Sequence, residues 1–550
     1  MSKNLIASVL LITILLFSCT SNKQNNNIII GVASDVESFN PLYAFSVEEG
    51  NITELLYLSL LQYDWNSDLG EVEFQPMLAN KWNWSEDKEV LTIKIRDDVY
   101  WSDSVKCTVD DVIFSFDLYS DPIVQSRALG FFEKYYTNED GHILLDQTFE
   151  KISDNELIIK FKSESNPDLF EIDHPIIPKH VFENIERAEI SSSSINQNPV
   201  TNGSYILKKW DRDQAVILSK NSASFIISEN SADQIIFKIV PEYQVRLTQL
   251  MNGEIDLMED IHSDDIKKLN ELSQLSIVPI QGRDFDYIAW NNIDPQKYSI
   301  DGSINKNFFF GSANVRKALT HALDREVVIN EYLKGFGQLS VGPVSPIFKS
   351  LFDSSLTIHK FDQKLSKKLL KLEGWKDNND DGIIEKDGVD FTFTLHIPSG
   401  NPRRDFAASL FKNNLLSVGI DMTIEKNELG VFIDNLFAKQ YDAWMAAWVV
   451  PIPINLKISW YSELEETPLN FASYRNKKID KQLDDIQGKD NFDKSNSYKE
   501  IQRVIHNEEP YSFLYWVDNV ISYNKRIRNV DISPLGAVRH CWQWVVINDE

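Results

Sequence analysis

The chain has 550 residues, a formal net charge of −27 and 43% hydrophobic residues. A chain of this length is too long for one hydrophobic core, so we expect about two or three domains. The strong acidity argues against nucleic acid as a partner and against adhesion to anionic lipid surfaces, because both are themselves negatively charged.

The first residues have the pattern of a secretory signal. Lys3 gives a basic start, an apolar run extends from Leu5 to Phe17, and Ser18 and Cys19 follow it. This run of about thirteen residues is shorter than the roughly twenty that a membrane-spanning helix needs. We therefore expect residues 1–19 to be a signal peptide and the rest of the chain to be soluble.

The end of the apolar run resembles the bacterial lipobox, in which a cysteine becomes the acylated first residue of the mature protein. Phe17 stands where a small residue is usual. We expect Cys19 to carry the lipid, which binds a membrane with about 0.8 kcal/mol per buried methylene. The polar residues 20–27 are expected to form a flexible tether. Thr20 is not the aspartate of an inner-membrane retention signal, which favours the outer membrane of a two-membrane cell.

Two further cysteines, Cys107 and Cys541, are too few for a disulfide framework. The sequence does not decide whether they pair with each other. Two separate, partly buried thiols are the simpler expectation.

Periodic patterns predict both strands and helices along the chain. Alternating apolar and polar residues predict half-buried strands at 91–95 and 391–397. An apolar stripe predicts a helix that starts near Asn314, and a second helix is expected to run from a cap at Asp362 to Gly374. Strands and helices are interspersed, so the predicted fold class is α/β.

The chain lacks the motifs of the common enzyme classes. There is no G-x-S-x-G elbow, no H-E-x-x-H pair, no Walker loop and no dinucleotide fingerprint. The nine histidines are scattered along the sequence. We therefore predict no catalytic residues, no metal site and no cofactor.

One stretch imitates a calcium loop. Asp377, Asn379 and Asp381 alternate before Gly382, but Gly388 stands where a bidentate glutamate is required. We expect a polar turn that leads into the strand beginning at Phe391, with calcium binding as the alternative.

Several segments resemble, in family order, the bacterial extracellular solute-binding proteins of family 5, which deliver dipeptides and oligopeptides to ATP-driven importers. They include VESFNPLYA at 36–44, the long signature QPMLANKWNWSEDKEVLTIKIRDDVYWSDSVKCTVDDVIFSF at 75–116, and IQRVIHNEEPYSFLYW at 501–516. The resemblance implies a type II periplasmic-binding-protein fold, with two hinged lobes and an extra subdomain, and a ligand enclosed between the lobes.

The resemblance and the breaks in the sequence together imply domain boundaries. Lobe I is expected to comprise 28–71, 198–290 and 509–550, the extra subdomain 72–197, and lobe II 291–508. The implied partners are a peptide or other small-molecule ligand and the permease and ATPase subunits of an ABC importer. The implied location of this monomeric lipoprotein is the periplasmic space or the cell surface.

The group that would recognise a peptide's amino terminus is missing from its usual place. Peptide-binding members of the family use an aspartate in a tryptophan-containing loop, and the corresponding segment here, MAAWVVPIPINL at 445–456, has no carboxylate. A charge-assisted hydrogen bond of about 1.5–3 kcal/mol would be lost without it. Either Asp442, Asp284 or Asp286 substitutes, or the ligand has no free amine.

Three groups of residues are the predicted ligand contacts. They are Ser38, Phe39 and Asn40 after the first strand, the adjacent Arg403 and Arg404, which offer a bidentate fork for a carboxylate, and Trp444, Trp448 and Trp460, which can line a cleft. The alternatives are ordinary turn chemistry, a solvated helix start and core packing.

The expected function is capture of an oligopeptide-like solute for import. A nonpeptide cargo such as a glycan, an opine or a metal chelate is the leading alternative. A sensor or chaperone that uses the same cleft, and an enzyme, are the alternatives outside transport.

Overall fold

The computed structural model describes residues 26–464, 467–486 and 491–547. Its largest element is an 11-stranded mixed sheet. In order across the sheet, its strands are β17 (Asp421–Asn427), β16 (Thr392–Pro398), β18 (Ala443–Val449), β12 (Leu275–Trp290), β19 (Tyr511–Asn524), β11 (Leu257–Met258), β1 (Asn27–Val32), β10 (Gln234–Ile239), β9 (Ala215–Lys220) and β8 (Tyr205–Asp211), and β13 (Gly337–Leu339) also pairs with β19.

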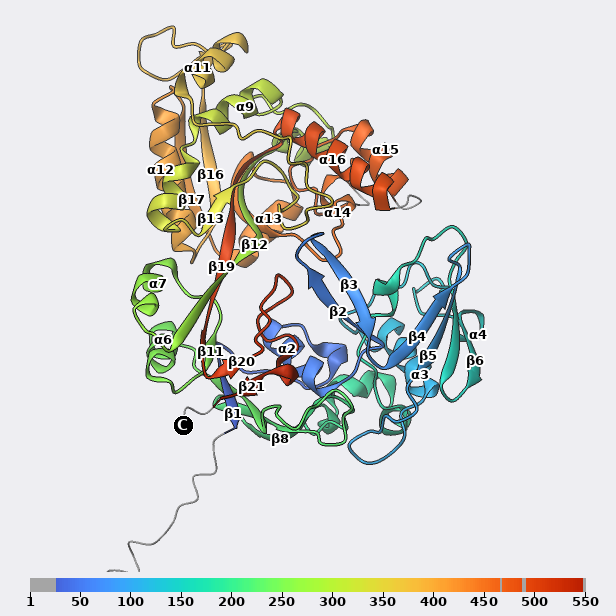
Figure 1. Ribbon diagram of the computed structural model, residues 1–550. Helices are drawn as coiled ribbons and strands as arrows, with labels where there is room; N and C mark the ends of the chain where they lie inside the picture. Colours follow the sequence, from blue (N-terminus) through green and yellow to red (C-terminus); the bar gives the residue numbers. More distant parts are fainter. Residues whose placement is uncertain (1–25, 465–466, 487–490, 548–550) are drawn as a thin grey trace, which may run out of the picture.

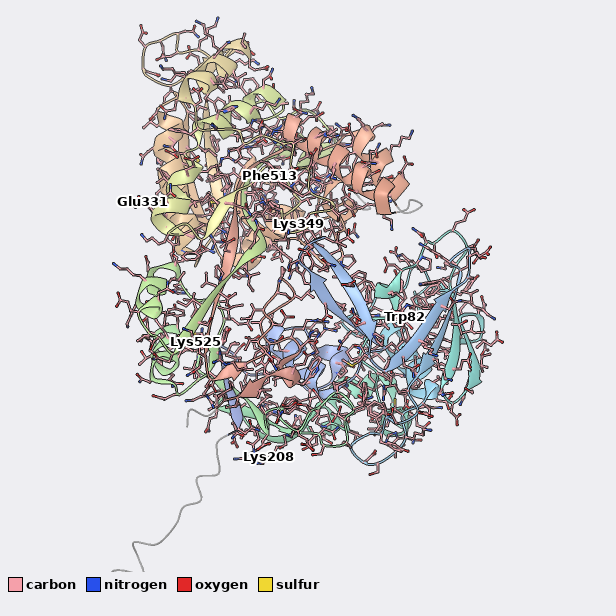
Figure 2. The ribbon with its side chains drawn as sticks, in the orientation of Figure 1. Trp82, Lys208, Glu331, Lys349, Phe513 and Lys525 are labelled. Carbon is pink, nitrogen blue, oxygen red and sulfur yellow. The ribbon has the colours of Figure 1, made fainter. Side chains whose placement is uncertain are left out.

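The long antiparallel strands β12 and β19 connect the upper and lower halves of the molecule (Figure 1). Phe513, near the start of β19, lies in the upper half, and Lys525, directly after its end, lies in the lower half (Figure 2). The upper half contains the strands from β12 towards β17, and the lower half contains those from β11 towards β8.

The ladder between these two strands is interrupted where they pass from one half to the other. The register shifts between Ile280 and Asp284. Gly282 is required there, because a Cβ at this position would lie 1.6 Å from the carbonyl oxygen of Val517. A few irregular residues that connect two packed bodies can absorb the backbone rotations of a hinge.

Helices cover the sheet in both halves (Figure 1). The lower half carries α2 (Val47–Leu56), α6 (Tyr243–Asn252) and α7 (Ser263–Asn270). The upper half carries α8 (Pro295–Asp301), α9 (Ala313–Ala322), α10 (Arg325–Val327), α11 (Gln363–Leu372), α12 (Pro402–Leu416), α13 (Leu429–Phe437), α14 (Lys457–Trp460), α15 (Lys477–Ile486) and α16 (Asn491–Glu508).

A separate four-stranded sheet lies beside the lower half (Figure 1). Its strands are β4 (Ala79–Trp84), β5 (Val90–Ile95), β7 (Glu156–Lys160) and β6 (Phe149–Ser153), accompanied by α3 (Val109–Ser120), α4 (Leu145–Thr148) and α5 (Lys179–Phe182). Short two-stranded pairs complete the fold: β2 (Leu61–Asn66) with β3 (Glu71–Pro76), β14 (Glu385–Lys386) with β15 (Val389–Asp390), and β20 (Ile527–Arg528) with β21 (Val545–Val546).

The β2–β3 hairpin makes a second junction between the halves, because its tip contacts the segment 347–350. Trp65 packs edge-on against Phe348, with 5.6 Å between ring centroids. Lys349, labelled in Figure 2, donates from Nζ to the carbonyl oxygen of Ser67 at 2.6 Å. The two halves are therefore joined at the hinge strands and also at this hairpin.

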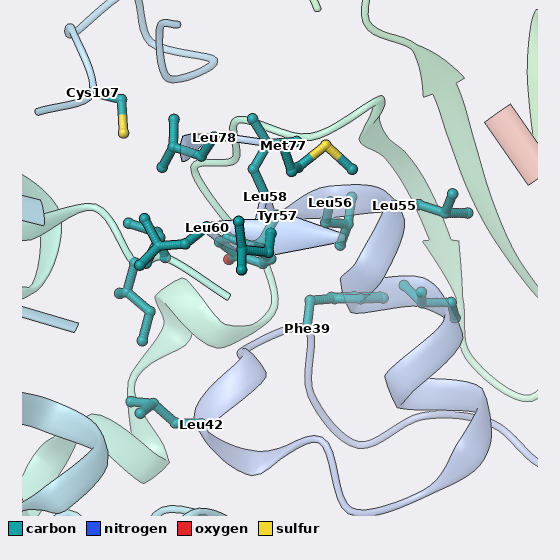
Figure 3. Close-up of a cluster of buried hydrophobic side chains, with 14 of the residues drawn as sticks. Phe39, Leu42, Leu55, Leu56, Tyr57, Leu58, Leu60, Met77, Leu78 and Cys107 are labelled. Atoms are coloured by element: carbon teal, nitrogen blue, oxygen red, sulfur yellow. The ribbon is translucent and has the colours of Figure 1, made fainter. Parts of the chain in front are cut away.

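The lower half and the four-stranded sheet share one hydrophobic cluster. Figure 3 shows part of it, including Phe39, Leu42, Leu55 and Cys107. Burial of such side chains contributes about 1.5–3 kcal/mol each. This cluster fixes the position of α2, which borders the candidate site.

The α/β class and the predicted elements are confirmed. The strands predicted at 91–95 and 391–397 correspond to β5 and β16, and the helix predicted near Asn314 is α9. Asp362 caps α11 by accepting from the backbone N–H of Leu365 at 2.9 Å. Gly374 follows this helix with φ of +93°, a conformation that glycine adopts without strain.

The remaining expectations either agree with the described residues or are not tested by them. The signal peptide, Cys19 and most of the tether lie outside the described residues. Cys107 and Cys541 are both buried and unpaired. The stretch from Asp377 to Gly388 forms an exposed turn and the β14–β15 hairpin before β16. Among the described residues, none of the helices combines the length and the apolar character that crossing a bilayer requires.

Candidate functional site

A cavity of about 390 Å³ lies beside the hinge and is called the hinge cavity here. Its walls come from the end of β1, the start of α2, the irregular part of β12, the facing part of β19 and a C-terminal loop. The lining residues are Gly31, Val32, Ala33, Val47, Glu48, Asn51, Arg246, Glu259, Asp260, Ile280, Gln281, Gly282, Arg283, Asp284, Asn519, Ile521, Ser533, Pro534, Leu535, Gly536 and Ala537. Segments far apart in the sequence thus meet where the halves are hinged.

Carboxylates dominate the charge of the hinge cavity. Its lining includes Glu48, Glu259, Asp260 and Asp284. Within the described part of the chain, none of these carboxylates forms a hydrogen bond or an ion pair through its side chain. Anionic groups left without partners at a void favour a cationic ligand.

The guanidinium groups of the same cavity are held by backbone carbonyls. Arg246 donates from Nη1 to the carbonyl oxygens of Val240, at 2.5 Å, and Pro241, at 3.3 Å. Arg283 donates from Nη1 to the carbonyl oxygen of Val450 at 2.8 Å. These bonds fix the two arginines in the cavity wall. Among the described residues, neither arginine forms a direct ion pair with a carboxylate of the cavity.

Burial and mutual repulsion raise the pKa values of the carboxylates. Loss of hydration raises the pKa of Glu259 to about 7, and the neighbouring Asp260 and Glu48 add to this shift. Burial also raises the pKa of Asp284, against the opposing charge of Arg283. A cation in the cavity would relieve this repulsion and favour the ionised carboxylates.

A second cavity, of about 280 Å³, adjoins the first along α2 and is called the α2 cavity. The two cavities share Val47, Asn51 and Leu535. Charged residues of both signs line the α2 cavity: Glu54, Arg127, Asp173 and Arg539. Burial raises the pKa of Asp173 to about 6, although Arg539 opposes the shift. The adjoining cavities suit an elongated ligand with charged groups.

Helix α2 positions one wall of both cavities. Val47, Asn51 and Glu54 recur at helical spacing and line the cavities. Ile52 and Leu55 lie on the other face and are 1% exposed in the hydrophobic core. The face that carries Asn51 and Glu54 therefore lies away from the core, because Ile52 and Leu55 hold the opposite face of the helix within it.

The predicted arginines are engaged with an internal acid. Arg403 donates to both carboxylate oxygens of Asp286, from Nε at 2.7 Å and from Nη2 at 3.1 Å. Arg404 lies near the same carboxylate, with its Nε 3.7 Å from Oδ1. Both arginines begin α12, and Asp286 is fully buried on β12. A direct contact of these arginines with a ligand stays a prediction.

The predicted residues after the first strand pack against other elements. Phe39 is fully buried in the cluster of Figure 3, and its ring lies 5.1 Å from that of Trp210. Asn40 donates from Nδ2 to Oδ1 of Asn196 at 2.9 Å. Ser38 accepts from the backbone N–H of Asn40. The hinge and α2 cavities are lined by the following helix rather than by these residues, whose ligand contact stays a prediction.

The predicted tryptophans gather in the upper half. Trp444 is 1% exposed within a hydrophobic cluster. Trp448 and Trp460 border a small cavity of about 20 Å³, and Trp460 also packs against Tyr511 with 4.9 Å between ring centroids. The structure brings these residues near one another, but their contact with a ligand stays a prediction.

The three acids that the sequence offered as substitutes for the missing aspartate have different surroundings in the structure. Asp442 accepts from Nδ2 of Asn307 at 2.6 Å, and Asp286 pairs with Arg403. Asp284 lines the hinge cavity. Sequence reasoning missed Glu259 and Asp260, whose only signal is an acidic pair directly after the short strand β11.

Comparison with known proteins identifies the family. A family model described as bacterial extracellular solute-binding proteins, family 5, middle part, matches residues 73–461. The chain belongs to this family. The predicted resemblance and the type II periplasmic-binding-protein fold are thereby confirmed. The family consists of extracellular solute-binding proteins rather than enzymes.

Known proteins resemble the chain over almost its whole length. The oligopeptide-binding protein AppA of Bacillus subtilis (strain 168) is 26% identical over 98% of both chains. The solved structure of Bacillus subtilis AppA in complex with a nonapeptide has a TM-score of 0.71, with 24% identity over 95% of this chain and 99% of that one. NikZ from Campylobacter jejuni, in complex with Ni(L-His), has a TM-score of 0.72 with the same identity and coverage.

Proposed function

We propose that this protein is the substrate-binding component of an ABC importer and that it captures an oligopeptide-like solute with a free amino terminus. The observation that carries the proposal is the group of unpaired carboxylates in the hinge cavity, with Asp284, Glu259 and Asp260 replacing the missing aspartate. A peptide ammonium group would gain charge-assisted hydrogen bonds there. The α2 cavity would hold the following residues of the peptide.

Peptide titration tests this proposal. The lipid-free chain is titrated calorimetrically with a mixed peptide library and with the same library after N-terminal acetylation. We expect the acetylated library to bind about ten- to a hundredfold more weakly, since each lost charge-assisted bond costs about 1.5–3 kcal/mol. Absence of heat and of a thermal shift with both libraries contradicts peptide binding, and equal affinity contradicts recognition of the amine.

Binding is proposed to occur without chemical change of the ligand. Peptides recovered from the protein after long incubation should have unaltered masses. Cleaved or modified peptides would show that the protein is an enzyme.

The ligand is proposed to close the two lobes about the hinge. We assign 28–71, 198–290 and 509–550 to lobe I, 72–197 to the extra subdomain and 291–508 to lobe II. The irregular region of β12 between Ile280 and Asp284 then falls inside the lobe I range, a few residues before its end at 290. The last residues of β12 pack in the upper half. A ligand favours the closed state only by its additional contacts in that state, so contacts with both lobes are needed.

Delivery to the importer is the second part of the proposal. Permease and ATPase subunits should co-purify with the protein from its native membrane after mild crosslinking. A sensor or chaperone would bind peptides equally well and would not bring these subunits with it.

The N-terminus is proposed to anchor the protein through lipid on Cys19, on the periplasmic or outer surface of the cell. Tethering raises the effective concentration of a monomeric binding protein at its importer. Mass spectrometry of the mature N-terminus should find an acylated cysteine, and Cys19→Ser should release the protein into the soluble fraction. An unmodified Cys19 in the native protein contradicts the anchor.

A nonpeptide solute is the second candidate. The absence of a carboxylate from the segment 445–456 favours it, and the similar NikZ structure holds a nickel chelate. If a metal chelate or an opine is the true ligand, it should displace bound peptides at lower concentration than any peptide displaces it.

A further inference from the structure

Three side chains that commonly bind transition metals lie together in the upper half, apart from the two cavities. His359 belongs to the segment between β13 and α11, His506 to the last turn of α16, and Glu509 to the link between α16 and β19. One ligand atom from each lies within 4.8 Å of the other two. Neither the hinge cavity nor the α2 cavity is lined by these residues.

The spacing and burial of this cluster suit a metal ion. Nε2 of His359 lies 3.3 Å from Oε1 of Glu509. Two ligand atoms of a tetrahedral ion with bonds of about 2.0–2.1 Å are separated by about 3.3 Å. Glu509 is 2% exposed and His506 is 6% exposed, so water does not solvate this carboxylate freely.

Hydrogen bonds orient the cluster as they orient metal ligands in known sites. Nδ1 of His506 lies 3.0 Å from the carbonyl oxygen of Val341. A carbonyl only accepts, so Nδ1 carries the hydrogen and Nε2 keeps a free lone pair, the arrangement that metal-binding histidines usually have. Oε2 of Glu509 accepts from Oγ1 of Thr320 at 2.8 Å. Nε2 of His359 lies 3.3 Å from both Oε1 of Glu509 and the carbonyl oxygen of His506, so it carries the hydrogen in the metal-free protein. An ion would take the place of this hydrogen, and Nδ1 of His359 would carry the hydrogen instead.

Two buried arginines hold the backbone that carries the ligands. Arg325 donates from Nη2 to the carbonyl oxygen of His359. Arg316 donates from Nε to the carbonyl oxygen of Glu509 at 3.0 Å. Fixed backbone positions reduce the ordering that metal binding would otherwise require.

We propose that His359, His506 and Glu509 form a binding site for a divalent transition-metal ion with the ligand preference of Zn²⁺. Two imidazoles and one carboxylate are a ligand set of known zinc sites, with a fourth position open. The ion links the segment before α11 to the junction of α16 and β19, and so stabilises the upper half independently of the solute.

The stacking of the imidazoles defines the movement that binding requires. The rings of His359 and His506 are parallel within 5°, with centroids 4.2 Å apart. A metal lies in the plane of each ring that binds it, so one ring must turn. The side chain of His359 is 19% exposed, which gives it more freedom than His506 has.

Metal titration of the whole chain tests the site. The protein carries Cys19→Ser and no affinity tag, is stripped with a chelator, and is titrated with ZnCl₂ and with CoCl₂. We expect one ion per chain, a Co²⁺ visible absorption band typical of low coordination number, and a raised thermal midpoint. His506→Gln and His359→Gln should each lower the affinity at least about tenfold.

A surface histidine provides the matched control. His180, whose Nε2 lies 2.7 Å from Asp103, also combines an imidazole with a carboxylate, and His180→Gln should leave metal affinity unchanged. Absence of Zn²⁺ binding overturns the proposal. So does binding that survives His506→Gln and is lost in Asp284→Asn, because that result places the metal in the hinge cavity.

A measurement on the unchanged histidines covers variants that fail to fold. Diethylpyrocarbonate modification, mapped by peptide mass spectrometry, should slow at least about fivefold at His359 when Zn²⁺ is added, and should be unchanged at His180. Equal modification of His359 with and without Zn²⁺ overturns the proposal.

Discussion

The hinge cavity and the interior of the upper half meet along β12, and they surround similar carboxylates very differently. Asp286 is fully buried and accepts two hydrogen bonds from Arg403. Asp284 is half-buried at the hinge cavity, with no ion pair in the part of the chain that the structure describes. A carboxylate paired inside the protein cannot lose its charge without leaving a buried, uncompensated partner, whereas one left unpaired at a void is available to a ligand.

The same comparison explains the place of the predicted arginines. A guanidinium that donates two hydrogen bonds to a buried carboxylate keeps three of its five N–H donors, but its orientation is fixed and its charge is balanced by that carboxylate. Arg403 is in this state. The pair of arginines predicted to bind a ligand carboxylate thus balances the charge of Asp286, a carboxylate of the protein itself.

The largest expected effect is on stability, from removal of the charge of Asp286. Asp286→Asn leaves Arg403 and Arg404 without their anionic partner, so we expect the free energy of unfolding to fall by about 3–5 kcal/mol. Urea unfolding followed by circular dichroism measures it. Asp284→Asn is the matched control and should change stability by less than about 1 kcal/mol. Equal losses in both variants would remove the distinction between the two carboxylates.

The reverse order is expected for ligand affinity. Asp284→Asn should weaken binding of a peptide with a free amine by about ten- to a hundredfold, because a charge-assisted hydrogen bond is lost. Binding of the N-acetylated peptide should change much less. Calorimetric titration of both peptides measures the difference, and an unchanged affinity for the free amine would exclude Asp284 as its partner.

The boundary between the two regions depends on Gly282. Gly282→Ala places a methyl group against the carbonyl oxygen of Val517, so we expect a loss of about 1–3 kcal/mol of stability and altered closure. Gly342→Ala is a suitable control, because an added Cβ there meets nothing within 4 Å. Thermal unfolding and small-angle scattering with and without ligand measure both effects. Similar behaviour of the two variants would show that the irregularity does not need glycine.

The smallest effect is a pH dependence through Glu259, whose pKa burial raises to about 7. Ionisation of Glu259 above this pH favours an ammonium ligand, so affinity should rise by up to about tenfold from about pH 6 to about pH 8. Calorimetric titration at both values measures the change, and Glu259→Gln should remove it. The same pH dependence in Glu259→Gln would assign the effect to another group.

The stability of the unliganded protein should fall as the pH rises and Glu259 ionises, whereas its affinity for an ammonium ligand rises. The folded-state pKa of Glu259 lies above its ordinary value of 4.5. Its contribution to stability is therefore complete below about pH 4.5 and is lost as the pH rises through about 7.

The sequence by itself determined the class, the family and many elements. The alternation at 391–397 and the capped pattern from Asp362 to Gly374 are local, so they predicted β16 and α11 without knowledge of the fold. Family order along the chain was likewise readable from the residues. Periodicity can be read from a single sequence because it depends only on residues within a short window. The order of motifs can be read directly along the chain.

Only the tertiary structure decided which charged groups meet. Arg403 and Asp286 are 117 residues apart, and His359 and His506 are 147 apart. Glu259 reaches the hinge cavity because β11 pairs with both β1 and β19. A side chain becomes a charge partner, a cavity wall or a metal ligand through strand order and packing, and these bring together residues whose local sequence carries no record of their contact.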